Sequence, residues 1–111
     1  SSVEGAESKY RVSEILFNRG ELAAAEEGVY DFIEKNTPHQ YWMGEAFLLL
    51  SDIYIAQEDE FQAIHTLKSI IDYYTIPDDG IVDEAKRRHD NLTKEAESEI
   101  PEDLEASLGT E

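Results

Sequence analysis

The stretch from Tyr41 to Tyr74 has the most regular spacing of apolar and polar positions in the chain. Its apolar residues recur at the three- and four-residue intervals that mark one face of an α-helix. The polar run Gln57–Glu60 interrupts the pattern and separates two stripes. The pattern predicts two amphipathic helices joined by a turn, each of which must bury its apolar face against the rest of the chain. The stripes are Trp42, Ala46, Leu49, Leu50, Ile53 and Tyr54, then Ala63, Leu67, Ile70, Ile71 and Tyr74.

A similar pair of helices precedes this stretch at a constant distance of 38 residues, which brings Leu50 onto Val12. Small and acidic positions match along with the apolar ones, which two unrelated amphipathic helices would not share. The chain therefore contains an internal repeat of helix–turn–helix units. The matched pairs are Val12 and Leu50, Ser13 and Ser51, Glu14 and Asp52, Ile15 and Ile53, Leu16 and Tyr54, Phe17 and Ile55, Ala25 and Ala63, Val29 and Leu67, Phe32 and Ile70, Ile33 and Ile71, and Glu34 and Asp72.

These units resemble the tetratricopeptide repeat (TPR) family, in which two antiparallel helices span about 34 residues and small residues lie where they cross. Gly20 occupies the turn of the first unit, as is common in that family, whereas the second unit has Glu58 there. The resemblance covers roughly residues 5–96 and implies an all-α, right-handed superhelix of two units and a C-terminal capping helix. The residues that carry it are Ser13, Gly20, Ala25 and Phe32 in unit one and Ser51, Tyr54, Ala63 and Ile70 in unit two.

The chain divides into a short frayed start (residues 1–5), unit one (6–37) and unit two (38–76). The first helix should run from Val3 or Gly5 to Arg19, and Gly20 permits the left-handed residue that ends many helices. We expect this helix to bury Val12, Ile15 and Leu16. In the next helix, Gly28 costs about 1 kcal/mol relative to alanine, which predicts a close approach of two helices at that point.

The start of the third helix and the end of the chain carry their own signals. Thr37, Pro38 and Gln40 form a capping-box pattern. Asp79 is the predicted N-cap of a fifth helix over residues 79–96, which we interpret as a polar cap on the array. Its thin inward stripe is Ile81, Ala85, Arg88 and Leu92. Residues 97–111 are acidic, and we expect them to be disordered.

Composition narrows the classes of partner. The chain of 111 residues is long enough for one domain, and its 26 acidic and 9 basic residues give a net charge of -17. This charge disfavours binding to nucleic acid or to an anionic membrane surface and would attract a basic partner. The longest apolar run is far too short to insert into a bilayer. Because the chain begins without methionine or a signal peptide, we expect it to be an excerpt of a longer protein.

No constellation for catalysis, metal binding or cofactor binding is recognisable. There is no cysteine, so thiol and zinc–thiolate chemistry is unavailable. His39, His65 and His89 lie in three different predicted elements, and none has a second histidine four residues away. The acid clusters lack the spacing of a calcium loop and are typical of helix starts. We therefore expect no enzymatic activity.

The resemblance implies that the first helices of successive units line a concave groove, which in TPR arrays binds peptides or protein segments. Four of the mapped groove residues are large, apolar and outside the core stripes, namely Tyr10, Phe17, Leu48 and Ile55. We expect these four to form an exposed apolar strip, which is typical of an interaction surface. The mapped residues are Tyr10, Glu14, Phe17 and Asn18, then Leu48, Asp52 and Ile55, and finally Arg87 and Asn91.

The resulting hypothesis is a non-enzymatic protein–protein interaction scaffold that belongs to a larger protein. Three alternatives stay open: further units cover the strip and make it core, the module self-associates into a homo-oligomer, or it is the regulatory or substrate-docking domain of an enzyme that lies upstream in the same protein. The segments 36-NTPHQYW-42 and 47-FLLLSDIY-54 are also similar to TPR proteins of bacterial envelopes. That similarity slightly favours a periplasmic or envelope location.

Overall fold

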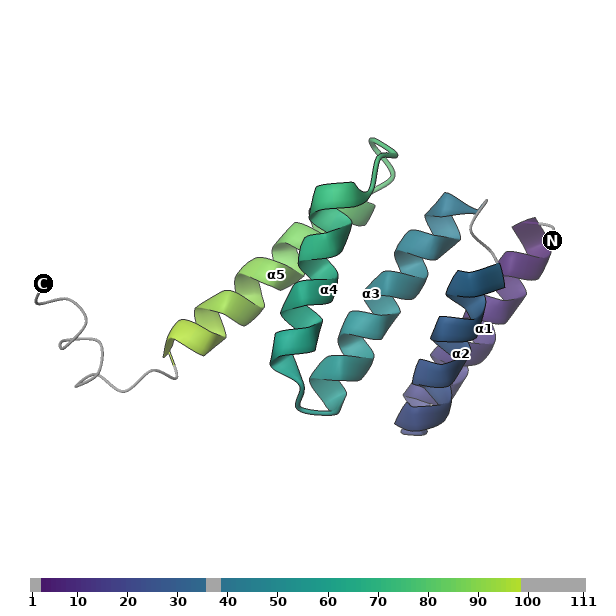
Figure 1. Ribbon diagram of the computed structural model, residues 1–111, viewed down its shortest axis with the longest axis horizontal. Coiled ribbons are helices and arrows are strands. Elements are labelled where there is room, and N and C mark those ends of the chain that lie inside the picture. Colours follow the sequence, from purple (N-terminus) through teal and green to yellow (C-terminus); the bar gives the residue numbers. More distant parts are fainter. Residues whose placement is uncertain (1–2, 36–38, 99–111) are drawn as a thin grey trace, which may run out of the picture.

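The computed structural model describes residues 3–35 and 39–98 of the chain. Within these residues it contains five α-helices and no strand, so the predicted all-α class is confirmed (Figure 1). The helices are α1 (Val3–Asn18), α2 (Leu22–Lys35), α3 (Gln40–Ala56), α4 (Glu60–Tyr73) and α5 (Ile81–Ser98). The predicted capping residues Thr37 and Pro38 lie outside the described residues, as does the tail from residue 99 onward.

Two helical hairpins and a fifth helix make up the arrangement. α1 pairs with α2 and α3 pairs with α4, and each helix also packs against the next one along the chain. α3 additionally contacts α1 and α5, so the first helices of successive units form one row. α2 and α4 supply a second row, and the helices follow one another across the molecule in chain order (Figure 1).

The turns of the two hairpins have the same backbone geometry, although their sequences differ. Gly20 has φ 79° and Glu58, 38 positions later, has φ 62°. The amide of Glu21 donates a hydrogen bond to the Leu16 carbonyl (2.9 Å), and the amide of Asp59 donates to the Tyr54 carbonyl (2.8 Å). These bonds and the left-handed residue define a Schellman motif. The repeat therefore extends to the turn, even where its glycine is replaced.

The second helix of each unit buries matching residues. Ala25, Val29 and Phe32 of α2 are buried, and so are their counterparts in α4, Ala63, Leu67 and Ile70. A β-carbon added at Gly28 would lie 2.5 Å from Ser13 Oγ, so the Ser13 hydroxyl would have to turn aside, and 3.7 Å from the Ser13 β-carbon. The close approach of α1 and α2 predicted from this glycine is confirmed.

The predicted inward face of α1 is wrong. Val12 and Ile15 are 57% and 54% exposed, whereas α1 buries Ala6, Tyr10 and Ser13. Leu16 is half-buried against the core. Their repeat counterparts in α3, Leu50 and Ile53, are buried.

The cause of this difference lies in the neighbours of α3. Tyr54 and Gln57, on the same stripe of α3 as Leu50 and Ile53, make side-chain hydrogen bonds to Tyr30 and Glu26 of α2. This stripe of α3 therefore packs against α2 of the preceding hairpin. Among the described residues, α1 has no helix in that position.

α5 packs against α4 and part of α3 through the inward stripe that the sequence predicts for it. Ile81, Ala85 and Leu92 are buried. The predicted N-cap of α5 is displaced by one residue, because the Gly80 carbonyl accepts the first bond of the helix from the Glu84 amide (3.0 Å). Asp79 precedes this N-cap, and its carboxylate accepts a hydrogen bond from the Ile81 amide (3.1 Å) and another from the Tyr74 hydroxyl.

Candidate protein-binding surface

The residues mapped to the groove come from the row of first helices, α1, α3 and α5, and differ widely in exposure. Asn18, Ile55, Arg87 and Asn91 are exposed, and Glu14, Phe17 and Asp52 are half-buried. Tyr10 and Leu48 are buried, at 7% and 4% exposure. The expectation that these two side chains form an exposed apolar strip is therefore wrong. We call the exposed and half-buried members, together with Tyr41 and Glu45 of α3, the first-helix face.

Tyr10 links α1 to α3. Its ring lies 5.5 Å from the ring of Trp42, and the Arg11 guanidinium lies over both rings at 5.4 and 5.6 Å. The Tyr10 hydroxyl donates a weak hydrogen bond to Glu14 (3.5 Å). Burial raises the pKa of Tyr10, and the negative charge of Glu14 raises it further. These contacts give Tyr10 a packing role between helices.

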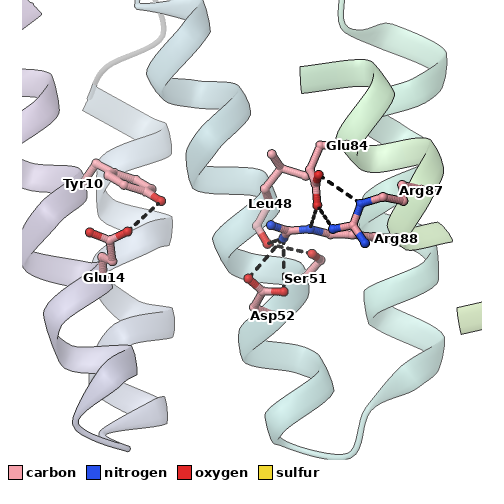
Figure 2. A network of polar contacts seen from close by, with 8 residues as sticks. All are labelled: Tyr10, Glu14, Leu48, Ser51, Asp52, Glu84, Arg87 and Arg88. Carbon is pink, nitrogen blue, oxygen red and sulfur yellow. Dashed lines mark hydrogen bonds and ion pairs between the residues drawn. The ribbon is translucent and has the colours of Figure 1, made fainter. Parts of the chain in front are cut away.

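Arg88 links α5 to α3 (Figure 2). Its Nη1 atom lies 3.1 Å from both carboxylate oxygens of Asp52 and donates to the Leu48 carbonyl at 3.1 Å. The Ser51 hydroxyl also donates to that carbonyl (2.7 Å). On α5 itself, Arg88 Nε donates to Glu84 (2.6 Å). One guanidinium therefore holds two carboxylates and a backbone carbonyl from two helices.

The two carboxylates around Arg88 are perturbed in opposite directions. Burial raises the pKa of Asp52 in spite of the attraction of Arg88. Hydrogen bonding from Arg87 and then from Arg88 lowers the pKa of Glu84. Both acids thus face arginines, and this end of the first-helix face carries little excess charge. Arg88 was predicted to lie in the inward stripe, but no partner was assigned to it. A single charge at an apolar position was the available signal for a partly buried ion pair.

Tyr41 and Glu45 are a second feature that the sequence mapping missed. Tyr41 lies on α3 and is 42% exposed, and its ring meets Trp42 edge-on at 5.0 Å. The negative charge of Glu45 is the main cause of the raised pKa of the Tyr41 hydroxyl. An aromatic residue outside both stripes was the available signal, although Leu48 shows that such a position can also be buried. Aromatic side chains such as tyrosine are enriched at protein-binding surfaces.

A separate apolar hollow of about 340 Å³ lies between the N-terminal end of α3 and the C-terminal end of α4. Its walls include Met43, Phe47, Ile70 and Tyr73. Tyr73 is on α4, in the second row of helices, and is 80% exposed. This hollow is the rival location for a ligand.

Two further findings concern the part of the chain that the structure describes. No group of three or more histidine, aspartate or glutamate side chains in residues 3–35 and 39–98 could hold a metal ion. None of the five described helices is both long and apolar enough to cross a membrane.

Comparison of the chain with models of protein families, with curated proteins and with solved structures gives no match.

Proposed function

We propose that the chain is a protein-interaction scaffold whose first-helix face binds a basic segment of another protein. The proposal includes a TPR-like, right-handed superhelical arrangement of the two hairpins and α5, as part of a larger protein. Its main support is the pair of exposed apolar side chains on α3, Tyr41 and Ile55, on a face that also carries half-buried carboxylates. Exposed aromatic and aliphatic side chains supply anchoring contacts, and the surrounding charges select the partner.

The charge of the chain favours a basic partner. With a net charge of -17, the chain attracts positively charged segments from a distance and repels acidic ones. On the first-helix face, Arg11 pairs with Glu14 (2.9 Å) and with Glu7 (3.5 Å), while Arg88 pairs with Asp52 and Glu84. Glu45 lies in the same row, and its negative charge helps to raise the pKa of the Tyr41, Tyr10 and Tyr74 hydroxyls. Lysine or arginine of a partner would pair with Glu45.

No catalytic step is part of the proposal. The three histidines come from separate places: His39 precedes α3, His65 is on α4 and His89 is on α5. The perturbed carboxylates, Asp52 and Glu84, already face arginines in a contact that holds α5 against α3.

The direct test is a titration of the isotope-labelled chain with two peptides, followed by NMR. One peptide contains lysine, arginine and leucine, and its control has glutamate at each basic position. We expect shift changes at Asn18, Tyr41, Ile55 and Asn91 with the basic peptide alone. Changes confined to Met43, Phe47 and Tyr73 would place the site in the apolar hollow instead, and equal responses to both peptides would contradict a basic partner.

A matched pair of substitutions separates the two locations. Tyr41→Ser removes an exposed aromatic side chain from the first-helix face, and Tyr73→Ser removes one from the hollow. Loss of an anchoring aromatic weakens binding by about 2 kcal/mol, which is more than tenfold in Kd. We expect this loss for Tyr41→Ser only. The reverse result would overturn the assignment, and far-UV circular dichroism of both proteins verifies that they are folded.

A further inference from the structure

α1 carries a stripe that is exposed along its whole length. Ser8, Val12 and Ile15 of α1 and Arg19 just after its end recur at helical spacing, and all four are exposed. We call these four residues the α1 stripe. Their counterparts 38 positions later in α3 are Ala46, Leu50, Ile53 and Gln57, of which the first three are buried. The first three positions therefore have opposite environments in the two units, whereas the fourth is exposed in both.

In α3, the covering element is α2. The Gln57 side-chain amide donates a hydrogen bond to Glu26 of α2 at 2.8 Å, and the hydroxyls of Tyr54 and Tyr30 meet across the same interface. α2 presents half-buried Leu22 and Ile33 in addition to these polar contacts. The chain therefore already contains one interface of this kind. In it, the second helix of one hairpin packs against the first helix of the next hairpin.

We propose that the α1 stripe is a docking surface for an amphipathic α-helix of the α2 type, supplied from outside residues 1–111. The helix would cover Val12 and Ile15 with apolar side chains. It would place an acid opposite Arg19, at the position where Glu26 of α2 meets Gln57 of α3. Such a helix continues the packing of α2 on α3 by one further step in the same direction.

A second copy of this chain does not fit the surface as well. Within the described residues, the helices with the required pattern are α2 and α4, and their corresponding sides are already packed against α3 and α5. A second copy could therefore bring only its own α1 stripe. Two such stripes would bury Val12 and Ile15 from each copy as their only large apolar residues, far less than the roughly 800 Å² per partner of a stable interface.

The repeat period provides a probe for this surface. In an extended chain, a second copy of residues 1–38 is placed before Ser1, which keeps the 38-residue spacing and supplies the α2 sequence as the covering helix. We expect this extended chain to have a higher urea midpoint than the 111-residue chain. In the 111-residue chain, the Val12→Ser/Ile15→Ser substitution should leave the midpoint nearly unchanged, because both side chains are exposed there.

The same double substitution, made only in the original α1 of the extended chain, should abolish most of the gain. Ile55→Ser is the matched control, since Ile55 is exposed and lies on α3 away from the α1 stripe; it should lower the midpoint equally in both chains. The proposal is overturned if the substituted and unsubstituted extended chains have equal midpoints. Sedimentation of the 111-residue chain provides a second check. A dimer that dissociates on Val12→Ser/Ile15→Ser would assign the surface to a second copy and overturn the proposal too.

Discussion

At the scale of single residues, the two turns show which positions the fold constrains. Gly20 and Glu58 adopt the same left-handed conformation and make equivalent hydrogen bonds. A β-carbon at Gly20 would meet no atom within 4 Å, so the cost of a side chain there is conformational and not steric. For residues other than glycine, the left-handed conformation costs roughly 1–2 kcal/mol.

Glu58→Gly should therefore stabilise the chain. Relief of the left-handed strain exceeds the extra backbone entropy that glycine loses on folding, and we expect a net gain of about 0.5–1 kcal/mol in the free energy of unfolding. Urea unfolding followed by circular dichroism measures it. Glu58→Gln is the control for the loss of one negative charge, and Gly20→Ala should destabilise the first turn by a similar amount. A Glu58→Gly protein no more stable than Glu58→Gln would contradict the explanation.

Three tyrosines predict an alkaline limit to stability. Burial is the main cause of the raised pKa of Tyr10, Tyr30 and Tyr74, and hydrogen bonds to Tyr54 and Asp79 add to the effect at Tyr30 and Tyr74. Because the pKa of each folded hydroxyl lies above its ordinary value of 10.0, the unfolded chain releases these protons first. The stability they contribute is fully present below pH 10 and declines as the pH rises above it.

Absorbance at the tyrosinate band, recorded with helicity by circular dichroism, tests this pH dependence. We expect part of the tyrosine signal to appear only together with the loss of helix, above the ordinary pKa. Tyr10→Phe should reduce that late fraction. If all tyrosines ionise while the helices remain intact, burial does not protect them as described.

At the scale of the helices, the sequence predicts what depends on local pattern. The five helices, the two turns and the inward residues of α2, α4 and α5 follow from apolar spacing, from breaks such as Gly20 and from acidic residues near helix starts such as Asp79. The face of α1 could not be predicted this way, because the burial of Val12 or Ile15 depends on the neighbour that the stripe meets. The repeat matches Val12 and Ile15 to Leu50 and Ile53, but α2 covers only Leu50 and Ile53.

The errors in the candidate site have a related origin. Tyr10 and Leu48 were expected to be exposed because they lie outside the apolar stripes. However, α3 contacts all four other helices, and burial is therefore spread around much of its circumference. Leu48 is covered where α5 approaches and Arg88 bonds to its carbonyl. Pattern alone cannot place such a contact, because Leu48 and Arg88 are 40 residues apart.

The contact of Gly28 with Ser13 predicts coupling between α1 and α2. Alanine at position 28 gains about 1 kcal/mol of helix propensity but places its β-carbon 2.5 Å from Ser13 Oγ. In a Ser13→Ala background the nearest atom would be the β-carbon of residue 13 at 3.7 Å, an ordinary contact. We expect Gly28→Ala to be more favourable in that background by about 1 kcal/mol, measured as a double-mutant cycle. Additive effects would show that the Ser13 side chain moves aside at no cost.

At the scale of the whole molecule, the excess of acidic residues acts on folding and on binding in opposite ways. The acidic residues that give the net charge of -17 repel one another in the compact state, and they attract a basic partner. Added salt shortens the screening length from about 30 Å at 0.01 M to about 10 Å at 0.1 M. The same change in conditions should therefore strengthen the fold and weaken the proposed interaction.

We expect the urea midpoint to rise between 0.01 and 0.1 M NaCl, while the Kd for the basic peptide increases over the same range. Glu27→Gln/Glu34→Gln, which neutralises two exposed positions on α2, should raise the low-salt midpoint and reduce its salt dependence. Because α2 lies outside the first-helix face, this variant should change the peptide Kd less than Glu45→Gln does. A midpoint that falls with salt would mean that the ion pairs of Arg88 and Arg11 outweigh the general repulsion. A Kd insensitive to salt would remove the electrostatic basis of the proposed function, leaving Tyr41 and Ile55 to bind an uncharged segment.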